Sequence, residues 1–306
     1  MTLRTFFSIP LAFACLLTTL CFSGVSARAA GVEHVFIISF DQGAPAGIEK
    51  ADMPVFKQMA ASGAHAREAW TIVPSSTLPS HTSMLTGVGI QKHQIHWNDF
   101  WAPGKKQLDI PTIFNLAKDS GRGLVTAAYV SKQKFRLFEY RGGIDHFILP
   151  KNESSLSVAA AFAEDVGRLK PNLCFIHFGE PDVMGHLYGI WSPEKMKAFA
   201  DSDAALKKIR DAVSAAGILD KSVFILTADH GCHDTRDKEG KTVGTHGSAN
   251  SDDVIIPWVA WGHGVRSGFA ITTPVVQYDT AATALWLLGL PVPEDFWGRP
   301  VTSAFE

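Results

Sequence analysis

Several features are scarce in this 306-residue sequence, and each scarcity excludes a class of protein. Four cysteines are too few for a scaffold stapled by disulfides. The 28 basic and 30 acidic residues nearly cancel, so no basic field favours specific binding to nucleic acid. Beyond residue 29 no apolar run is long enough to predict a transmembrane helix. Glycine and proline show no fixed period, which excludes a collagen-like fibre, and 46% hydrophobic residues exclude a mostly disordered chain.

Residues 1–29 have the features of a secretory signal peptide. The basic side chain of Arg4 precedes an almost wholly apolar stretch over residues 6–22, and Ala27 and Ala29 then form an A-x-A site. The alternative is an uncleaved membrane anchor, which the position of the A-x-A site directly after the apolar stretch disfavours. We therefore expect cleavage after Ala29 and a periplasmic or secreted protein.

After the leader, short apolar runs alternate with longer segments of helical spacing. The runs have the length and the β-branched or aromatic content of buried strands: residues 35–40, 124–130, 146–149, 173–178, 223–228 and 255–261. Helical segments lie between them: residues 55–62, 111–120, 156–169, 193–216 and 280–288. This alternation predicts a largely parallel sheet covered on both faces. No repeat or long linker divides the chain, so we expect residues 30–306 to form one α/β domain.

Six acidic or histidine residues follow strand ends or lie in a glycine-containing loop: Asp41, Asp182, His186, Asp229, His230 and His246. In open α/β sheets ligands bind beyond the carboxyl ends of the strands, so these side chains can meet at one edge. Carboxylates and imidazoles together suit zinc. Each residue alone has a plainer interpretation: Asp41 as a turn former or helix cap, and His246 as an exposed loop residue. Asp182 and His186 stack only if their segment is helical.

Thr77 is the candidate nucleophile, at the start of a segment with helical spacing in S-S-T-L-P-S-H. A hydroxyl at such a position is most often only an N-cap. The catalytic interpretation is that metal coordination activates an otherwise weak threonine nucleophile, while the helix N-terminus favours an anion such as phosphate. Asn98 offers an amide donor to a developing negative charge.

Together these motifs resemble the alkaline phosphatase superfamily, and most closely its type I phosphodiesterase/nucleotide pyrophosphatase branch. The elements that carry the resemblance are T-x-P-x-H from Thr77, E-P-D-x-x-G-H, D-H-G and T-H-G-S, within about residues 35–296. The resemblance implies an α/β/α sandwich with a central, mostly parallel sheet, two zinc ions per chain and a phosphothreonine intermediate. It also implies a phosphate contact from Asn98. One zinc would be held by Asp182, His186 and His246, and the other by Asp41, Asp229, His230 and the Thr77 hydroxyl.

The chain departs from the family pattern at two positions beside these motifs. Gln42 stands where the family usually has glycine, and Cys232 occupies a variable place after D-H-G. Neither departure removes a ligand, so they bear on the substrate rather than on the metal core. Sulfatases of the superfamily need cysteine and arginine where this chain has Thr77 and His81, which disfavours sulfatase activity.

The substrate is expected to be a small phosphate ester or a phosphonate. Lys132 and Lys134 resemble the lysine pair that holds the substrate carboxylate in phosphonoacetate hydrolases, although two solvated surface charges would fit the sequence equally well. An aromatic segment around Trp97 could line the leaving-group pocket; its members are His96, Trp97, Phe100 and Trp101. Aromatic residues near loops have a packing role just as often. Three hypotheses therefore compete: a zinc phosphodiesterase or pyrophosphatase, a phosphonoacetate-type hydrolase, and a non-catalytic zinc- or phosphate-binding protein. The intact Thr77 disfavours the third.

Overall fold

The computed structural model describes Met1 and residues 31–99 and 107–306. The expected signal peptide lies outside the described residues, apart from Met1, and so do Phe100 and Trp101 of the aromatic segment.

One nine-stranded sheet forms the centre of the fold, in the order β10-β2-β9-β6-β1-β5-β3-β4, with β11 also paired to β2. Neighbouring strands from β6 to β4 run parallel, whereas β9 runs antiparallel to both β6 and β2. The strands are β1 (His34–Phe40), β2 (Ala64–Trp70), β3 (Thr126–Tyr129), β4 (His146–Ile148), β5 (Leu173–Phe178), β6 (Ser222–Ala228), β9 (Ile255–Gly262), β10 (Phe269–Ala270) and β11 (Val275–Val276).

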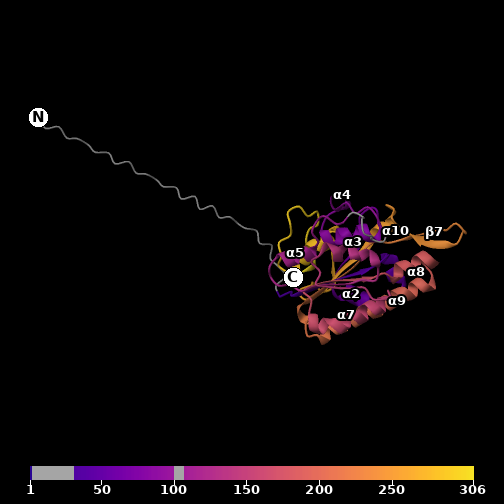
Figure 1. Ribbon diagram of the computed structural model, residues 1–306, viewed down its shortest axis with the longest axis horizontal. Helices are drawn as coiled ribbons and strands as arrows, with labels where there is room; N and C mark the ends of the chain where they lie inside the picture. The colour runs from indigo at the N-terminus through magenta and orange to yellow at the C-terminus, as the bar shows by residue number, and fades with distance from the viewer. Residues whose placement is uncertain (2–30, 100–106) are drawn as a thin grey trace.

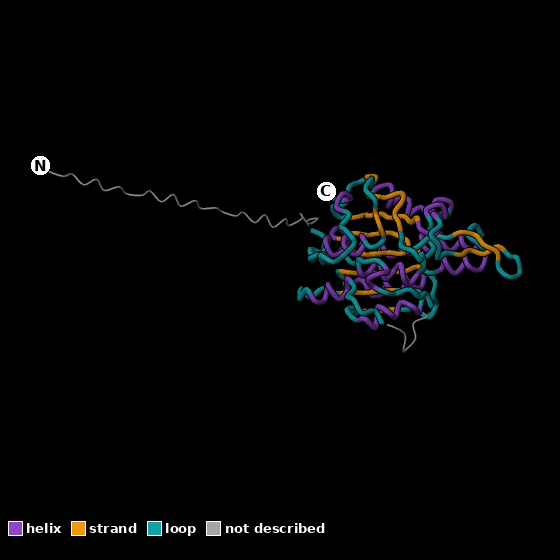
Figure 2. Tube along the Cα trace, turned by 90° about the horizontal axis from the view of Figure 1, so that it is seen from above, coloured by secondary structure: helices purple, strands orange, loops and turns teal. Residues whose placement is uncertain are grey.

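Helices cover both faces of this sheet, so the fold has three layers (Figures 1 and 2). Successive β1 side chains alternate between two cores: Val35 and Ile37 join one, and Phe36, Ile38 and Phe40 join the other. The first core packs against α3 (Thr77–Thr86), α5 (Ile113–Asp119), α6 (Arg136–Arg141) and α11 (Asp279–Leu287). The second packs against α1 (Pro45–Lys50), α2 (Pro54–Ser62), α7 (Ser155–Leu169) and α9 (Pro193–Ala215).

The predicted fold class, an α/β/α sandwich with a mostly parallel sheet, is confirmed. The structure adds strands that have no apolar run to predict them. Residues 64–70 of β2 carry Arg67 and Glu68 on their exposed side, so the sequence lacks the pattern of a buried strand. The hairpin of β7 (His233–Arg236) and β8 (Thr242–Thr245) is mostly exposed and projects from the domain (Figure 1).

Two helices begin at the edge of the sheet where the parallel strands end. Helix α8 (Glu180–Tyr188) follows β5 after Gly179, and Pro181 stands in its first turn, where proline is favoured. Helix α3 begins at Thr77 and is buried along its whole length. Shorter helices α4 (Ile90–His93) and α10 (Ser251–Val254) lie in neighbouring loops. The carboxyl ends of β1, β5 and β6 therefore face the starts of α3 and α8.

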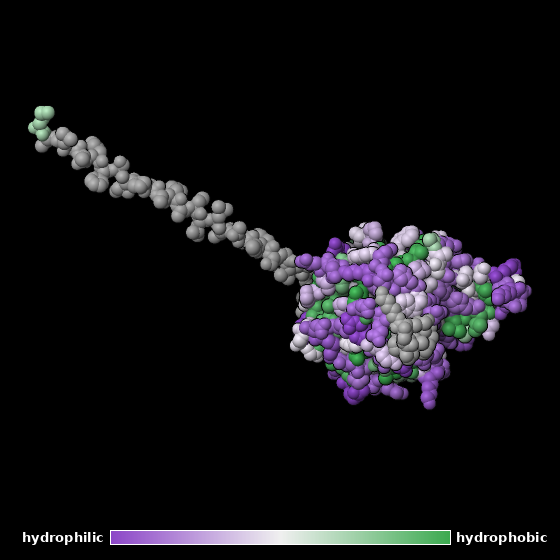
Figure 3. All heavy atoms as spheres, turned by 45° about the horizontal axis from the view of Figure 1, so that its top comes forward, coloured by the Kyte–Doolittle hydropathy of each residue, from purple (hydrophilic) through white to green (hydrophobic). Residues whose placement is uncertain are grey.

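The face in Figure 3 is mostly hydrophilic, with separate apolar patches. No helix among residues 31–99 and 107–306 is both long and apolar enough to cross a membrane. Cys174 and Cys232 are buried free thiols.

A buried histidine next to α3 predicts acid-sensitive stability. Burial, with a smaller effect of His96, lowers the pKa of His93 to about 3. Its ring accepts from the Ile95 N–H and contacts the Ser83 hydroxyl at 3.0 Å. The unfolded chain binds this proton near pH 6.5 and the folded chain does not, so stability falls as the pH drops from about 6.5 toward 3.

We expect His93→Gln to reduce the slope of the unfolding free energy against pH by up to about 1.4 kcal/mol per pH unit between pH 4 and 6. Urea unfolding of metal-free protein across that range measures the slope. Parallel curves for the variant and the wild type would contradict the assignment.

Candidate active site

The first cluster of metal-ligand side chains, here called the outer group, consists of Asp182, His186 and His246. Asp182 and His186 stand four residues apart on α8, so the helical stacking that their spacing requires is present. The Asp182 Oδ1 atom lies 3.2 Å from His186 Nε2 and 3.5 Å from His246 Nε2. The two histidine Nε2 atoms are 3.1 Å apart. Three candidate ligand atoms from two distant segments thus converge on one point.

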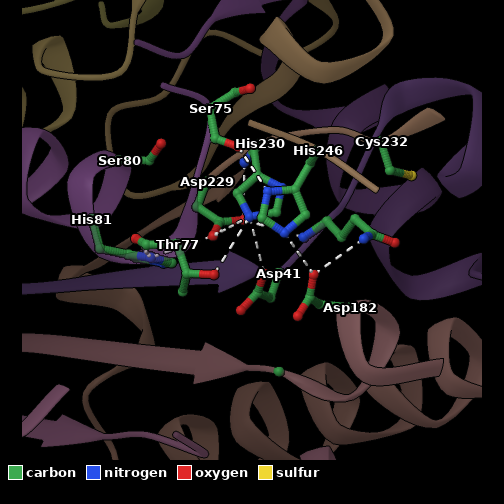
Figure 4. Close-up of polar contacts among 12 residues, drawn as sticks. Asp41, Ser75, Thr77, Ser80, His81, Asp182, Asp229, His230, Cys232 and His246 are labelled. Atoms are coloured by element: carbon green, nitrogen blue, oxygen red, sulfur yellow. Dashed lines mark hydrogen bonds and ion pairs between the residues drawn. The ribbon is translucent and has the colours of Figure 1, made fainter. Parts of the chain in front are cut away.

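The second cluster, the inner group, consists of Asp41, Asp229, His230 and Thr77. The His230 Nε2 atom lies 3.4 Å from Asp41 Oδ1, 3.2 Å from Asp229 Oδ2 and 3.5 Å from Thr77 Oγ1. All four side chains are buried, whereas His186 is partly exposed. The His230 and His246 rings stack with their centroids 3.8 Å apart, so the two groups adjoin (Figure 4).

Hydrogen bonds show which nitrogen of each histidine is free. The Nδ1 atoms of His186, His230 and His246 each lie 2.9 Å from a backbone carbonyl, of Gly244, Gly231 and Ser75 respectively. A carbonyl accepts only, so each Nδ1 carries a proton, and in the neutral imidazole Nε2 then presents a lone pair.

When the imidazoles are neutral and the carboxylates ionised, both groups bring acceptor atoms together. In the outer group two imidazole lone pairs and a carboxylate oxygen meet, and in the inner group His230 Nε2 meets two carboxylate oxygens. Asp41 Oδ1 and Asp229 Oδ2 are buried and have no hydrogen-bond donor among the described residues. A buried polar atom without a partner is costly, and a metal cation satisfies such atoms together. The residues present fit a metal site, with two candidate ligand sets that share Asp182: Asp182–His186–His246 and Asp41–Asp182–His230.

Lys132 lies between the two groups rather than at the surface. Its Nζ atom donates to Asp41 Oδ2 at 2.5 Å and to Asp182 Oδ2 at 2.6 Å, and its side chain is 13% exposed. The Oδ1 atom of Asp41 therefore faces the inner group, and the Oδ1 atom of Asp182 faces the outer group. His177 also donates to Asp41 Oδ2, at 3.0 Å. The lysine thus orients one carboxylate of each group.

The three carboxylates have different charge preferences. Burial alone would favour the neutral form of Asp41 and Asp182, but the Lys132 ammonium and histidine contacts hold the pKa of each well below its usual range. Burial and the nearby Asp41 charge raise the pKa of Asp229 well above normal. Burial also lowers the pKa of His230 to about 3, which keeps its imidazole neutral. In the outer group, the hydrogen bond to Asp182 raises the pKa of His186, so a cation must displace a proton from this imidazole more often than from His230.

Thr77 is the first residue of α3 and is not its cap. Ser76 occupies the N-cap position and makes no side-chain capping hydrogen bond. The Thr77 side chain is 1% exposed and its hydroxyl faces the inner group. Its backbone carbonyl accepts from His81 Nδ1 at 2.7 Å, and His81 Nε2 lies 2.8 Å from the Ser39 hydroxyl. These contacts tie the start of α3 to β1.

Asn98 and Lys134 lie together beside Thr77. The Asn98 Oδ1 atom accepts from the Leu78 N–H at 2.9 Å and from Lys134 Nζ at 3.1 Å. Burial lowers the pKa of the half-buried Lys134, and the neighbouring Lys132 charge adds to this effect. The interpretation of both lysines as solvated surface charges therefore does not hold.

The remaining candidate, Trp97, is partly buried and packs against the first core. Its Nε1 atom is buried and has no hydrogen-bond partner in the part of the chain that the structure describes. His96 is exposed. A packing role accounts for the contacts of Trp97.

Three side chains that support the site were not predicted from the sequence. They are His177, Ser131, and His81 in its role of linking α3 to β1. The Ser131 hydroxyl accepts from the Gly179 N–H at 2.8 Å and lies 3.0 Å from His177 Nδ1, so it orients that ring toward Asp41. A lone histidine inside the apolar run L-C-F-I-H-F was the available signal for His177.

Comparison with known proteins identifies the family of this chain. The family described as Type I phosphodiesterase / nucleotide pyrophosphatase matches residues 35–118 and 126–255, which include every residue of both groups. The chain belongs to this family. The predicted family is therefore confirmed.

Curated relatives of this family member include hydrolases and transferases by name. GPI ethanolamine phosphate transferase 1 of Emericella nidulans is 30% identical over 269 residues, which are 75% of this chain and 28% of the relative. Ectonucleotide pyrophosphatase/phosphodiesterase family member 7 of Homo sapiens is 26% identical over 251 residues, covering 73% of this chain and 53% of the relative. The chain thus spans about a quarter to a half of the length of these relatives.

Solved structures share the fold. Human ectonucleotide pyrophosphatase / phosphodiesterase 5 superposes with a TM-score of 0.72 at 18% identity, covering 89% of this chain and all of that chain. A 2-O glycosaminoglycan sulfatase, BT1596, superposes with a TM-score of 0.69 at 15% identity, covering 89% of this chain and 74% of that chain.

Proposed function

We propose that this chain is a two-zinc phosphoester hydrolase of the phosphodiesterase/nucleotide pyrophosphatase type, with Thr77 as its nucleophile. The observation that carries the proposal is the convergence of unprotonated Nε2 atoms and carboxylate oxygens in two adjoining groups, beside a buried threonine hydroxyl. Imidazole with carboxylate is a donor set typical of zinc. The proposal treats residues 30–306 as one catalytic domain and, with the leader expected at residues 1–29, places it in the periplasm or outside the cell.

In the proposed reaction the Thr77 Oγ1 atom forms a bond to phosphorus as the bond to the leaving oxygen breaks. A phosphothreonine results, and water then attacks its phosphorus and releases Thr77. Bound zinc would supply Lewis-acid stabilisation of the phosphoryl oxygens and lower the pKa of the hydroxyl. The chain itself holds Thr77 at the start of α3, excludes bulk water by burial, and offers Asn98 and the Lys134 ammonium to the phosphoryl group. In support, a murine ectonucleotide pyrophosphatase / phosphodiesterase 5 structure with AMP carries a threonine-to-alanine change and is described as inactive.

The charges at the site favour a phosphodiester over a monoester. A monoester carries one more negative charge, and the Lys132 charge is already paired with Asp41 and Asp182. Arg67, the arginine nearest to Thr77 in the preceding sequence, lies exposed on β2. Lys134 remains as the cation beside Asn98.

A second candidate function has a specific observation in its favour. Lys134 Nζ lies next to Asn98, and Lys132 lies within the site, as a phosphonoacetate-type hydrolase would require for holding a substrate carboxylate. Lys132 is already paired with two aspartates, so Lys134 is the lysine of the pair that can hold a substrate carboxylate. Because the function would require both lysines, we rank it second.

Two measurements test the proposal. Elemental analysis after zinc reconstitution should give two zinc ions per chain, and a ratio below one would exclude the two-metal site. An aryl diester, the matching monoester and phosphonoacetate should then be compared by kcat/KM, with the diester the best substrate. Phosphonoacetate as the best substrate, with its turnover lost in Lys134→Met, would establish the second function instead.

A further inference from the structure

The residue directly after Asp41 is a glutamine in a conformation that glutamine rarely adopts. Gln42 has φ +60°, in the left-handed region, and its side chain is fully buried. Glycine, which the family usually has here, takes this conformation without steric cost. A strained residue persists when its surroundings require it, so the contacts of the Gln42 side chain are informative.

Both ends of the Gln42 carboxamide are engaged. Its Nε2 atom donates to Asp182 Oδ1 at 3.1 Å, and its Oε1 atom accepts from Lys195 Nζ in a short contact. The backbone N–H of Gln42 separately donates to Asp229 Oδ1 at 3.1 Å. One residue thus contacts a carboxylate of each metal-ligand group.

Lys195 fixes the direction of that carboxamide. It comes from the first turn of α9, is 1% exposed, and also lies 3.1 Å from Cys232 Sγ and 5.6 Å from the centre of the Phe199 ring. An ammonium donates only, so it must face Oε1 and leaves Nε2 to face Asp182. The second departure from the family pattern, Cys232, therefore belongs to the same cluster as the first.

Space for this pair is provided by a glycine on α8. A Cβ atom on Gly185 would lie 2.0 Å from Gln42 Oε1 and 3.0 Å from Lys195 Nζ. The helix that carries Asp182 and His186 therefore packs directly on the carboxamide.

Given the proposed function, we infer that Gln42 and Lys195 are positioning residues that hold the Asp182 carboxylate for the metal of the outer group. Lys132 donates to Asp182 Oδ2 and Gln42 donates to Asp182 Oδ1, so both oxygens are held while Oδ1 lies 3.2 Å from His186 Nε2 in the outer group. Removal of a residue that hydrogen-bonds a metal ligand typically lowers metal affinity by about 10- to 100-fold.

The test uses Gln42→Met, which removes the carboxamide at similar length and keeps the backbone N–H to Asp229. Zinc dissociation constants are measured by competition with a chromophoric chelator, and the Co²⁺-substituted protein is compared by visible absorption. We expect one of the two zinc ions to bind about 10- to 100-fold more weakly and the other to bind as in the wild type. In a His186→Ala background, which removes an outer ligand, Gln42→Met should not weaken the remaining zinc further.

Matched controls are Gln277→Met, a buried glutamine between β11 and α11, and Lys197→Met, an exposed lysine on α9. Both should bind two zinc ions as the wild type does. If Gln42→Met retains full affinity for both ions, or weakens both equally, the inference is wrong. If Gln42→Met does not fold, Lys195→Met is tested instead. Selective weakening of one zinc ion would support the inference, and unchanged binding of both would contradict it. A wild-type protein that binds no zinc at the outer group would instead refute the proposed function.

Discussion

Replacement of Thr77 by alanine is expected to lower kcat by a factor on the order of 10⁴–10⁶, the range found when a nucleophile is removed. The side chain is buried against the inner group, with its hydroxyl 3.5 Å from His230 Nε2. Alanine is compatible with the first turn of α3, where Thr77 is not the cap, so the fold should persist. Turnover of an aryl diester and zinc content, measured on the same sample, check both expectations.

Two variants make this result specific. Thr77→Ser keeps a hydroxyl and should retain substantial turnover. Thr82→Ala removes a buried hydroxyl of the same helix, one that donates to the Leu78 carbonyl at 2.7 Å, and should leave turnover near the wild-type value. Near-normal turnover in Thr77→Ala would mean that water or another group attacks the phosphorus.

Replacement of Lys132 by methionine is expected to destabilise the metal-free protein by about 3–5 kcal/mol, the usual cost of removing one partner of a buried ion pair. The Asp41 and Asp182 carboxylates would lose their common counter-charge. Zinc binding supplies positive charge to the same carboxylates, so the loss should be clearly smaller in the zinc-loaded protein. Chemical denaturation of both forms measures the difference.

Lys118→Met is the matched control because Lys118 pairs with Asp145 where both side chains are more than a third exposed. Its removal should cost less than about 1 kcal/mol in either form. Equal destabilisation of metal-free and zinc-loaded Lys132→Met would show that the ammonium does not share its carboxylates with a metal.

Much of the architecture could be predicted because its signals are local. Apolar runs gave β1, β5, β6 and β9 to within about one residue at each end, and helical spacing gave α2, α7 and α9. Strand β2 could not be predicted in this way, because its exposed side carries charged residues. Its pairing with β9 comes from a segment about 190 residues later in the chain, so no local pattern marks it.

For the site, the sequence by itself determined which residues have ligand chemistry and that strand ends would bring them to one edge. The motif at Thr77 placed a hydroxyl at a helix start, whereas the spacing of Asp182 and His186 left open whether their segment is a helix, which the structure shows it to be. Parallel strands with buried faces leave their carboxyl ends as the place where polar groups gather.

Only the tertiary structure decided how those side chains are charged and oriented. Lys132 pairs with Asp41 across 91 positions of the chain, and Gln42 meets Asp182 across 140. Whether a lysine is solvated or buried, and whether a glutamine merely replaces a glycine or holds a ligand, depends on which strands become neighbours in the sheet. Electrostatic and hydrogen-bond energies depend on distances of a few ångströms in a buried environment, and separation along the sequence does not specify such distances.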